Sequence, residues 1–224
     1  MKDYVAGKAW KQEKYDHILE AGFGFFAERG INSVKMTEVA KAGKVGDVTL
    51  YRYFPTKTEL VIAIAARKWT EFIDRYGGLK TPEEKEKLTG AEYLKFFVDS
   101  FLELYRNHKD MLRFNYDFNS FVRSAEWTDE QRQPYVQVAE AFGEQFHELY
   151  ERGMRDGTLN PDIPEQTMFS STYHIMLAAV TRYAVGLAVI IDSDPESELV
   201  MLAEMLLSRF TKINDINKTE EENI

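Results

Sequence analysis

Apolar residues recur along almost the whole chain at spacings of three and four residues, the pattern of an amphipathic helix, and no segment alternates apolar and polar positions as a half-buried strand does. The pattern predicts about nine helices and no sheet, so the expected fold class is all-α. The first helix is predicted to end at Gly30, because glycine commonly follows the last helical residue. Its apolar stripe is formed by Ile18, Leu19, Gly22, Phe25 and Phe26.

Two short helices are predicted next, over residues 36–43 and 47–53, separated by a turn of a few residues. Short helices bury little apolar surface. Two of them, braced by longer helices, form either an ordinary helical corner or a helix-turn-helix. The pattern alone leaves both alternatives open. The residues expected to face inward are Val39, Ala40, Leu50 and Phe54.

A long fourth helix is predicted to begin at Thr56-Lys57-Thr58-Glu59, which has the sequence of a capping box. The chain then breaks at Gly77-Gly78, and we expect the charged segment Glu83–Lys87 to belong to a linker. Two domains are expected, a head of residues 1–68 and a larger body of residues 69–224. The later helices are predicted over residues 89–107, 109–124, 128–155, 164–191 and 195–213.

Composition sets the broad class. The 224 residues are 44% hydrophobic, ample for packed cores, and the absence of cysteine excludes disulfides, thiolate metal sites and a cysteine nucleophile. The first residues lack the apolar core of a signal peptide, and the expected location is the cytoplasm. The net charge is −9, but residues 1–57 carry ten Lys and Arg against seven Asp and Glu. A slightly basic head on an acidic body is compatible with a nucleic-acid partner.

The segment Tyr173–Ile191 is nearly continuous in apolar residues and has about the length of a membrane span. It contains His174 and Arg182, and an arginine inside a membrane is costly. We therefore expect a helix buried in the protein and no membrane partner.

An enzyme is not expected from the sequence. The chain has no metal-binding helix pattern, no phosphate-binding loop and no serine elbow, and its four histidines, His17, His108, His147 and His174, lack ligand spacing. A small all-α enzyme stays a remote alternative. Neither a metal nor a cofactor is expected.

One stretch is more specific than its helical pattern. From Ile18 the chain reads ILEAGFGFFAERGI, and it continues with MTEVAKA from Met36 and TLYRYFPTKTEL from Thr49. Residues 14–68 thereby resemble the helix-turn-helix DNA-binding head of the tetracycline-repressor (TetR) family. The later residues carry no family motif, although their length and helices suit the family's ligand-binding and dimerising body. The resemblance implies a transcriptional regulator that binds double-stranded DNA.

The resemblance also implies which residues meet DNA. The start of the recognition helix, Asp47 to Thr49, is expected to face base edges in the major groove, with Tyr51 on the same helix face. Tyr53 and Lys57 match backbone contacts of the family, and Thr37 opens a helix from which the family often reaches DNA. The full predicted set is Thr37, Lys44, Asp47, Val48, Thr49, Tyr51, Tyr53 and Lys57.

Three departures from the family pattern concern the operator sequence. Lys35 stands where the family usually has a Ser or Thr cap, so a capping box with Glu38 is expected to be missing. The usual Ala-Gly of the turn is Gly43-Lys44, and Lys44 is a further candidate for a phosphate contact. Val48 replaces a small residue, and Asp47 is unfavourable near phosphates although it could accept a hydrogen bond from cytosine.

The residues before the head carry four lysines, Lys2, Lys8, Lys11 and Lys14. Two interpretations stay open. The segment is a disordered, solvated tail, or it is an arm that contacts the DNA backbone or minor groove.

The body is dense in aromatic residues. Each one alone is expected in the core, but together with polar side chains at helix positions expected to face inward they are consistent with an apolar pocket that has a few polar anchors. The resemblance implies such a pocket, and we expect a small apolar or aromatic effector. The predicted lining residues are Phe101, Tyr105, Phe114, Phe118, Phe142, Phe146, His147, Tyr173, His174 and Arg182.

The last two helices carry more apolar residues than a surface layer needs. The resemblance implies that they pair with their copies in a homodimer, and a dimer is also required if two recognition helices are to reach successive major grooves about 34 Å apart. The predicted interface residues are Met176, Val180, Leu187, Ile190, Leu199, Leu202, Leu206 and Phe210.

The expected function is therefore that of a ligand-responsive regulator. It would act as a repressor that binds a palindromic operator as a dimer and is released by its effector. An activator, or a regulator that needs no ligand, is the alternative.

Overall fold

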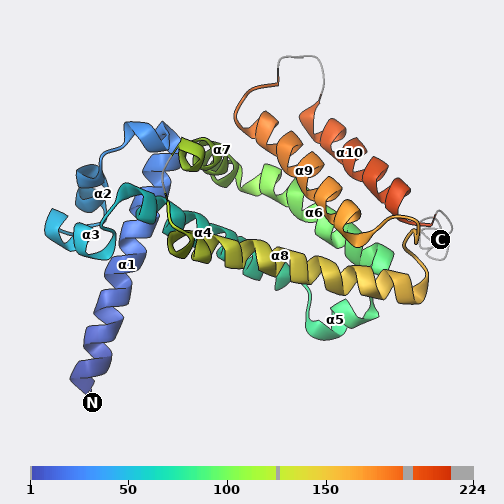
Figure 1. The fold of residues 1–224 in the computed structure, drawn as a ribbon, viewed down its shortest axis with the longest axis horizontal. Helices are drawn as coiled ribbons and strands as arrows, with labels where there is room; N and C mark the ends of the chain where they lie inside the picture. The colour runs from blue at the N-terminus through green and yellow to red at the C-terminus, as the bar shows by residue number, and fades with distance from the viewer. Residues whose placement is uncertain (1, 125–126, 189–193, 213–224) are drawn as a thin grey trace. The chain divides into compact units, whose positions relative to one another are not determined.

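Ten α-helices and one short 3-10 helix, η1, make up the described chain (Figure 1). The computed structural model describes residues 2–124, 127–188 and 194–212, with side chains from Lys11 onward. These residues contain no strand, only one isolated antiparallel bridge between Leu159 and Thr211. The predicted all-α class is confirmed. The elements in chain order are α1 (Lys2–Arg29), η1 (Ile31–Ser33), α2 (Met36–Ala42), α3 (Asp47–Tyr53), α4 (Lys57–Gly77), α5 (Pro82–Lys87), α6 (Gly90–Asn107), α7 (Lys109–Ser124), α8 (Asp129–Asp156), α9 (Glu165–Ala184) and α10 (Pro195–Phe210).

Two elements differ from the predicted pattern. The charged segment expected in a linker forms α5, because Thr81 and Glu84 exchange hydrogen bonds in a capping box and Pro82 occupies the first turn. Helix α9 ends at Ala184, well before the predicted end at residue 191. It stops there because Gly186 adopts a left-handed φ of 74°, a conformation that commonly terminates helices.

The chain divides into two compact units. Unit 1 comprises Met1–Phe72 and Asp110–Val138, and unit 2 comprises Ile73–Lys109 and Ala139–Ile224. The predicted head thus shares its compact unit with α7 and the beginning of α8. The functional division at residue 68 stays a prediction.

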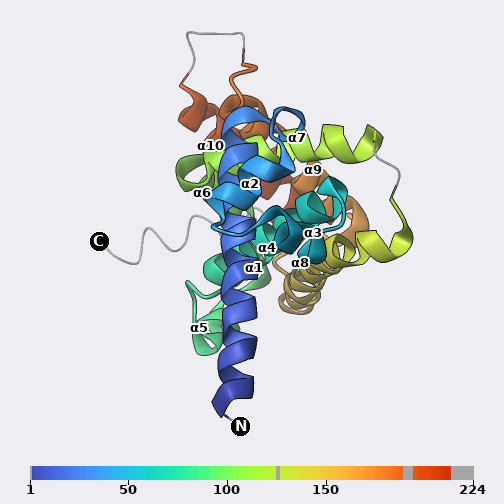
Figure 2. The same ribbon diagram turned by 90° about the vertical axis from the view of Figure 1, so that its left-hand side faces the viewer.

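The core of unit 1 is built on the apolar stripes of the first four helices. Helix α2 packs against α1 (Figure 2). Helices α1 and α4 approach closely at Gly22, where a Cβ atom would lie 2.6 Å from Cδ1 of Ile64. Of the residues predicted to face inward, Phe25 is partly buried, and the buried ones include Ile18, Leu19, Phe26, Val39, Ala40, Leu50 and Phe54. Leu60 and Ile64 of α4 are buried in the same core.

In unit 2, helices α6, α9 and α10 lie side by side (Figure 1). The beginning of α6 meets α8 at two glycines, since a Cβ atom on Gly90 would lie 2.0 Å from Cα of Gly153. The last residue of α8 and the loop that follows it cap α6: Asp156 accepts a hydrogen bond from the Gly90 amide at 2.7 Å, and the Thr158 hydroxyl accepts one from the Ala91 amide at 3.0 Å.

Among the described helices, none combines the length and the apolar character that crossing a membrane requires. The apolar segment that begins at Tyr173 is helical as far as Ala184. Its residues 189–191 lie outside the described residues.

Candidate nucleic-acid interface

The recognition helix α3 is attached to the core of unit 1 by few side chains. Leu50 is fully buried, and Phe54, which follows the helix, is 4% exposed. The outer face is open to solvent, with Val48 85% exposed and Tyr51 46% exposed, and Asp47 is exposed beside them. An apolar side chain as exposed as Val48 contributes little to the stability of the fold. The residues predicted to face base edges are therefore free to contact a partner; Thr49 among them is half-buried.

The turn between α2 and α3 places Lys44 in an unusual backbone conformation. Its φ is 55°, and no other non-glycine residue in the described chain has a positive φ. Gly43 before it has no room for a side chain, because a Cβ atom would lie 3.2 Å from the Val39 carbonyl oxygen and 3.3 Å from Cα of Ile18. The close approach of α1 fixes the glycine at position 43. The left-handed position of the turn therefore falls on an exposed lysine.

The start of α2 keeps half of the capping box that the sequence predicted to be missing. The Glu38 carboxylate accepts a hydrogen bond from the Lys35 amide at 2.8 Å, so that part of the prediction is wrong. The reciprocal bond is absent because a lysine side chain has no acceptor. Two hydrogen bonds to the Glu38 carboxylate lower its pKa. The one from the Lys35 backbone amide has the larger effect, and the one from the Arg29 side chain has the next largest. Thr37 on this helix is exposed.

Tyr53 and Lys57, the two predicted backbone contacts, are both bonded within unit 1. The Tyr53 hydroxyl donates to the Lys11 carbonyl at 3.1 Å, and the Lys57 ammonium donates to the Val34 carbonyl at 2.8 Å. Partial burial lowers the pKa of Lys57, opposed by the charge of Glu38. Lys57 keeps further donors for a phosphate, whereas Tyr53 has only one.

The segment before the head is helical. Helix α1 runs without interruption from Lys2, and Figure 2 shows it extending past α2 and α3. The backbone of the four predicted lysines therefore belongs to α1 and not to a disordered tail. Tyr15 joins this part of α1 to the end of α3, with its ring centroid 6.0 Å from that of Tyr53 and 5.2 Å from that of Phe54.

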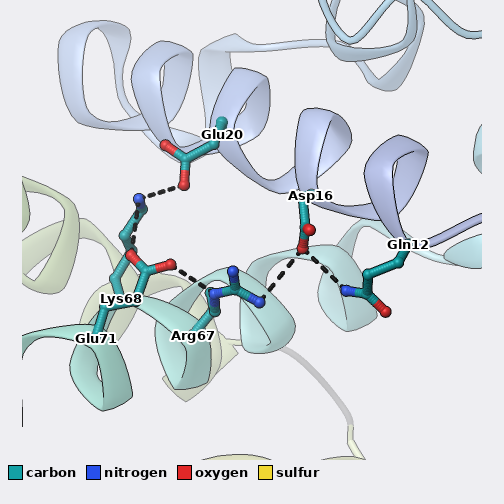
Figure 3. A network of polar contacts seen from close by, with 6 residues as sticks. All are labelled: Gln12, Asp16, Glu20, Arg67, Lys68 and Glu71. Atoms are coloured by element: carbon teal, nitrogen blue, oxygen red, sulfur yellow. Dashed lines mark hydrogen bonds and ion pairs between the residues drawn. The ribbon is translucent and has the colours of Figure 1, made fainter. Parts of the chain in front are cut away.

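A network of six polar side chains joins α1 to α4 (Figure 3). Asp16 on α1 lies 3.3 Å from Arg67, and Glu20 lies 2.6 Å from Lys68. On α4, Glu71 pairs with both cations, at 2.5 Å from Arg67 and 3.2 Å from Lys68. Burial opposes ionisation of Glu71, but these hydrogen bonds outweigh it and lower its pKa. The ion pairs between α1 and α4 and the Tyr53 bond could not be predicted from local sequence, because they join residues about 40 to 50 positions apart. The pairs of Glu71 with Arg67 and Lys68, in contrast, have the local helical spacing of four and three residues.

In unit 2, four of the predicted pocket residues come together with Phe97 and Phe169. Phe101 and Phe142 each lie next to Tyr173, with ring centroids 6.3 and 6.2 Å apart. Phe146 lies 5.3 Å from Phe97. Tyr105 is further along α6 and pairs with Tyr183. Burial raises the pKa of Tyr173, whose ring belongs to this aromatic cluster.

Five other predicted pocket residues lie elsewhere. Phe114 and Phe118 belong to the core of unit 1 beside Phe26. His147, His174 and Arg182 are exposed, so the expected inward orientation of all three is wrong. On α9 the buried positions follow a spacing of four, from Met168 through Met176 to Ala184, which turns residues 174 and 182 outward. His147 pairs with Glu165 at 3.1 Å, and this hydrogen bond raises the pKa of the histidine.

The predicted dimer residues also need correction. Five of them lie in the core of their own chain, because α9 and α10 bury their apolar faces against each other and α6. The buried residues are Met176, Val180, Leu199, Leu206 and Phe210. Leu202 is half-buried, Leu187 is 44% exposed, and Ile190 lies outside the described residues.

A different set of apolar side chains on these helices is exposed. Ile175 of α9 is 42% exposed, and Met201 and Met205 of α10 are 59% and 60% exposed. Met201 and Met205 are one helical turn apart and share a face of α10. These residues, missed in the sequence because α9 and α10 are apolar on several sides, are the ones that a second chain could cover.

The comparisons with known proteins agree with this arrangement. A family model described as bacterial regulatory proteins, tetR family, matches residues 18–64. The chain is 31% identical over 94 residues to the fatty acid metabolism regulator protein of Bacillus subtilis (strain 168), a match covering 42% of this chain and 46% of the relative. It is 36% identical over 87 residues to the HTH-type transcriptional repressor KstR of Rhodococcus jostii (strain RHA1), covering 39% of each chain. The chain therefore matches less than half of the length of these relatives.

The fold as a whole is similar to solved structures. The transcriptional regulator FadR of Bacillus subtilis, solved in complex with stearoyl-CoA, aligns over 87% of this chain and 98% of its own with a TM-score of 0.66. Its sequence identity is 20%, so this likeness concerns the fold.

Proposed function

We propose that this chain, whose residues 18–64 match the model of the tetR family of bacterial regulatory proteins, is a repressor that binds a near-palindromic operator as a homodimer and leaves it when a small apolar effector binds. Its known relatives are transcriptional regulators and not enzymes. The cytoplasm, where bacterial operator DNA is found, is the location that we propose for it.

The observation that carries this proposal is the exposure of α3. The helix presents Asp47, Val48 and Tyr51 to solvent from a two-turn element whose inner face is fixed by Leu50 and Phe54. A short helix with this division suits insertion into the major groove, where a valine methyl can contact a thymine methyl and a hydroxyl or carboxylate can bond base edges or phosphates. Lys44 and Lys57 flank the helix and supply positive charge for the DNA backbone.

We propose that the dimer forms on α9 and α10. The exposed side chains of Ile175, Met201 and Met205 offer an apolar surface on these helices. A two-fold pairing of this surface would bury the methionines and give an assembly with two copies of α3. Two recognition helices are what an operator with two half-sites, about one helical turn of DNA apart, requires.

The effector site that we propose lies near the aromatic cluster of unit 2. Phe101, Phe142, Phe146 and Tyr173 give this region an apolar character that suits an acyl chain or a flat ring. The Thr181 hydroxyl on α9 is buried and has no hydrogen-bond partner among the described residues, which makes it a candidate polar anchor. Effector binding is proposed to act through α4, since this helix passes from unit 1 into unit 2, and to change the separation of the two heads.

The test uses operator DNA selected by the protein itself and labelled for fluorescence anisotropy. Stearoyl-CoA and a free long-chain fatty acid are the first probes, because a relative is named for fatty acid metabolism and a fold neighbour was solved with stearoyl-CoA. We expect one of them to weaken operator binding by about five- to 150-fold, the usual range of an allosteric coupling. Coenzyme A without the acyl chain is the matched control and is expected to have no effect. Operator binding that no apolar probe weakens would contradict the effector part of the proposal.

A further inference from the structure

The Tyr53 hydroxyl donates its one hydrogen bond to the Lys11 carbonyl within unit 1. This bond points to a role for Tyr53 other than a DNA contact. We infer that Tyr53 and Arg67 are positioning residues, through which the α1 segment Lys11–Glu20 fixes the orientation of the recognition helix α3 relative to α4. The consequence for DNA binding rests on the proposed function.

Tyr53 adds an attachment to α3 beyond its two buried residues and its contacts with α2. Leu50 and Phe54 are four residues apart and therefore lie along one line on the inner face of the helix. An attachment beside such a line restrains rotation of the helix about it. Tyr53 lies beside that line, and its hydroxyl bonds the Lys11 carbonyl at 3.1 Å while its ring packs on Tyr15. This third attachment fixes the roll of α3, and with it the direction in which Val48 and Tyr51 point.

The same stretch of α1 is fixed to α4. Asp16, which follows Lys11 by little more than one helical turn, accepts a hydrogen bond from Gln12 at 3.0 Å and pairs with Arg67 at 3.3 Å. Figure 3 shows Arg67 reaching from α4 across to Asp16, with Glu71 on its other side. The α1 segment thus has α3 bonded at one end and α4 bonded along its length.

The network is more than a set of separate surface pairs. Exposed ion pairs taken singly contribute little, but Glu71 is shared by two cations and the Lys68 side chain is only 14% exposed. The Lys68 ammonium also lies 4.7 Å from the centroid of the Phe23 ring on α1. Arg67 and Lys68 come shortly before Phe72, the last residue of the first segment of unit 1, after which α4 continues to Gly77. A displacement of α4 would therefore reach α1 through these residues.

The first arm of the test needs no DNA. Deuterium uptake is measured in the full-length protein for peptides covering residues 11–20 and 47–54, in the wild type and in the variants Tyr53→Phe and Arg67→Met. Tyr53→Phe keeps the ring contacts and removes the donor, and Arg67→Met keeps the apolar stem. Both variants should speed exchange in α3, although Arg67 does not touch it. Arg29→Gln, which breaks the exposed pair with Glu38 at 2.8 Å, is the matched control and should leave α3 unchanged.

The second arm measures operator affinity. Tyr53→Phe should weaken binding roughly three- to tenfold, the effect of one lost hydrogen bond. A direct phosphate contact of the Tyr53 hydroxyl would instead act independently of Arg67, and its loss would add to the loss in Arg67→Met. The variant carrying both substitutions should bind no more weakly than the weaker single variant, because both act through the same α1 segment.

Two results would overturn the inference. They are unchanged exchange of α3 in Arg67→Met and additive losses of operator affinity in the double variant. If the wild-type protein bound no duplex DNA, the proposed function would fail, while the exchange arm would still decide whether Tyr53 and Arg67 position α3.

Discussion

Lys44 shows how a single residue can reveal a functional constraint. A left-handed conformation costs a non-glycine residue about 1–2 kcal/mol, and Lys44 occupies one at a φ of 55°. Strain of this kind persists where the surrounding structure imposes it and is concentrated at functional sites. We propose that the Lys44 ammonium contacts a DNA phosphate, which would account for a lysine at this exposed position of the turn.

The substitution Lys44→Gly should therefore stabilise the protein and weaken DNA binding. We expect the free energy of unfolding to rise by about 1 kcal/mol in urea denaturation, because the strain is relieved, and the salt slope of operator binding to decrease by about 0.9. Lys41→Gly is the control for stability. It makes the same substitution inside α2, where glycine should lower the free energy of unfolding by about 1 kcal/mol. If Lys44→Gly leaves operator binding intact, Lys44 makes no phosphate contact.

At the scale of elements, the crossing of α6 and α8 depends on glycine. A Cβ atom on Gly90 would overlap the backbone of Gly153, whose Cα would lie only 2.0 Å away. Because backbone cannot move aside as a side chain can, Gly90→Ala should lower the free energy of unfolding by about 3 kcal/mol. Gly143→Ala provides the contrast: nothing lies within 4 Å of its Cβ position in α8, and alanine should stabilise the helix by about 0.5–1 kcal/mol. Thermal unfolding of both variants measures this difference. Equal melting temperatures for Gly90→Ala and Gly143→Ala would contradict the close approach of α6 and α8.

The cap on α6 makes unit 2 sensitive to acid. Partial burial works against ionisation of Asp156, but the hydrogen bonds from Thr158 and the Gly90 amide outweigh it, so the pKa of Asp156 is lowered. A carboxyl whose pKa is lower in the folded than in the unfolded state contributes stability above its unfolded pKa of about 3.9, and that contribution disappears as the pH falls through the folded value.

The variant Asp156→Asn measures this contribution. At pH 7 it should lose about 1 kcal/mol of stability, the net value of a hydrogen bond to the cap. Between pH 5 and pH 2 its stability should fall less steeply than that of the wild type, because the titrating group is gone. Urea denaturation at several pH values provides the measurement. Parallel pH profiles for the two proteins would show that Asp156 does not supply the acid sensitivity.

The burial of Val39 and Leu50 could be predicted from the sequence because α2 and α3 are short and offer few apolar positions. Helix α9 is apolar on several sides, and the sequence could not show that Met176 faces its own core while Ile175 faces solvent. Position-specific contacts such as that of Tyr53 with Lys11 depend on tertiary packing, which local periodicity does not record.

For the whole molecule, the proposed dimer surface on α10 can be tested without DNA. The double variant Met201→Glu, Met205→Glu places two charges where both side chains are more than half exposed, so the chain should still fold. In a dimer interface the buried charges would be unpaired, and the assembly should dissociate into monomers at micromolar concentration. Sedimentation velocity reports the change. Met154→Glu, at a methionine 37% exposed on α8, is the control and should stay dimeric. A double variant that remains a dimer would place the interface elsewhere.

The central claim, that α2 and α3 form a sequence-reading head, is tested most directly by selection of binding sites from a pool of random duplex DNA with the full-length protein. We expect the selection to enrich an inverted repeat with half-sites about one helical turn of DNA apart. On this selected duplex, Tyr51→Ala should lose about 1–3 kcal/mol of binding free energy by fluorescence anisotropy. Selection that enriches no sequence, or a Tyr51→Ala isotherm identical to that of the wild type, would contradict it.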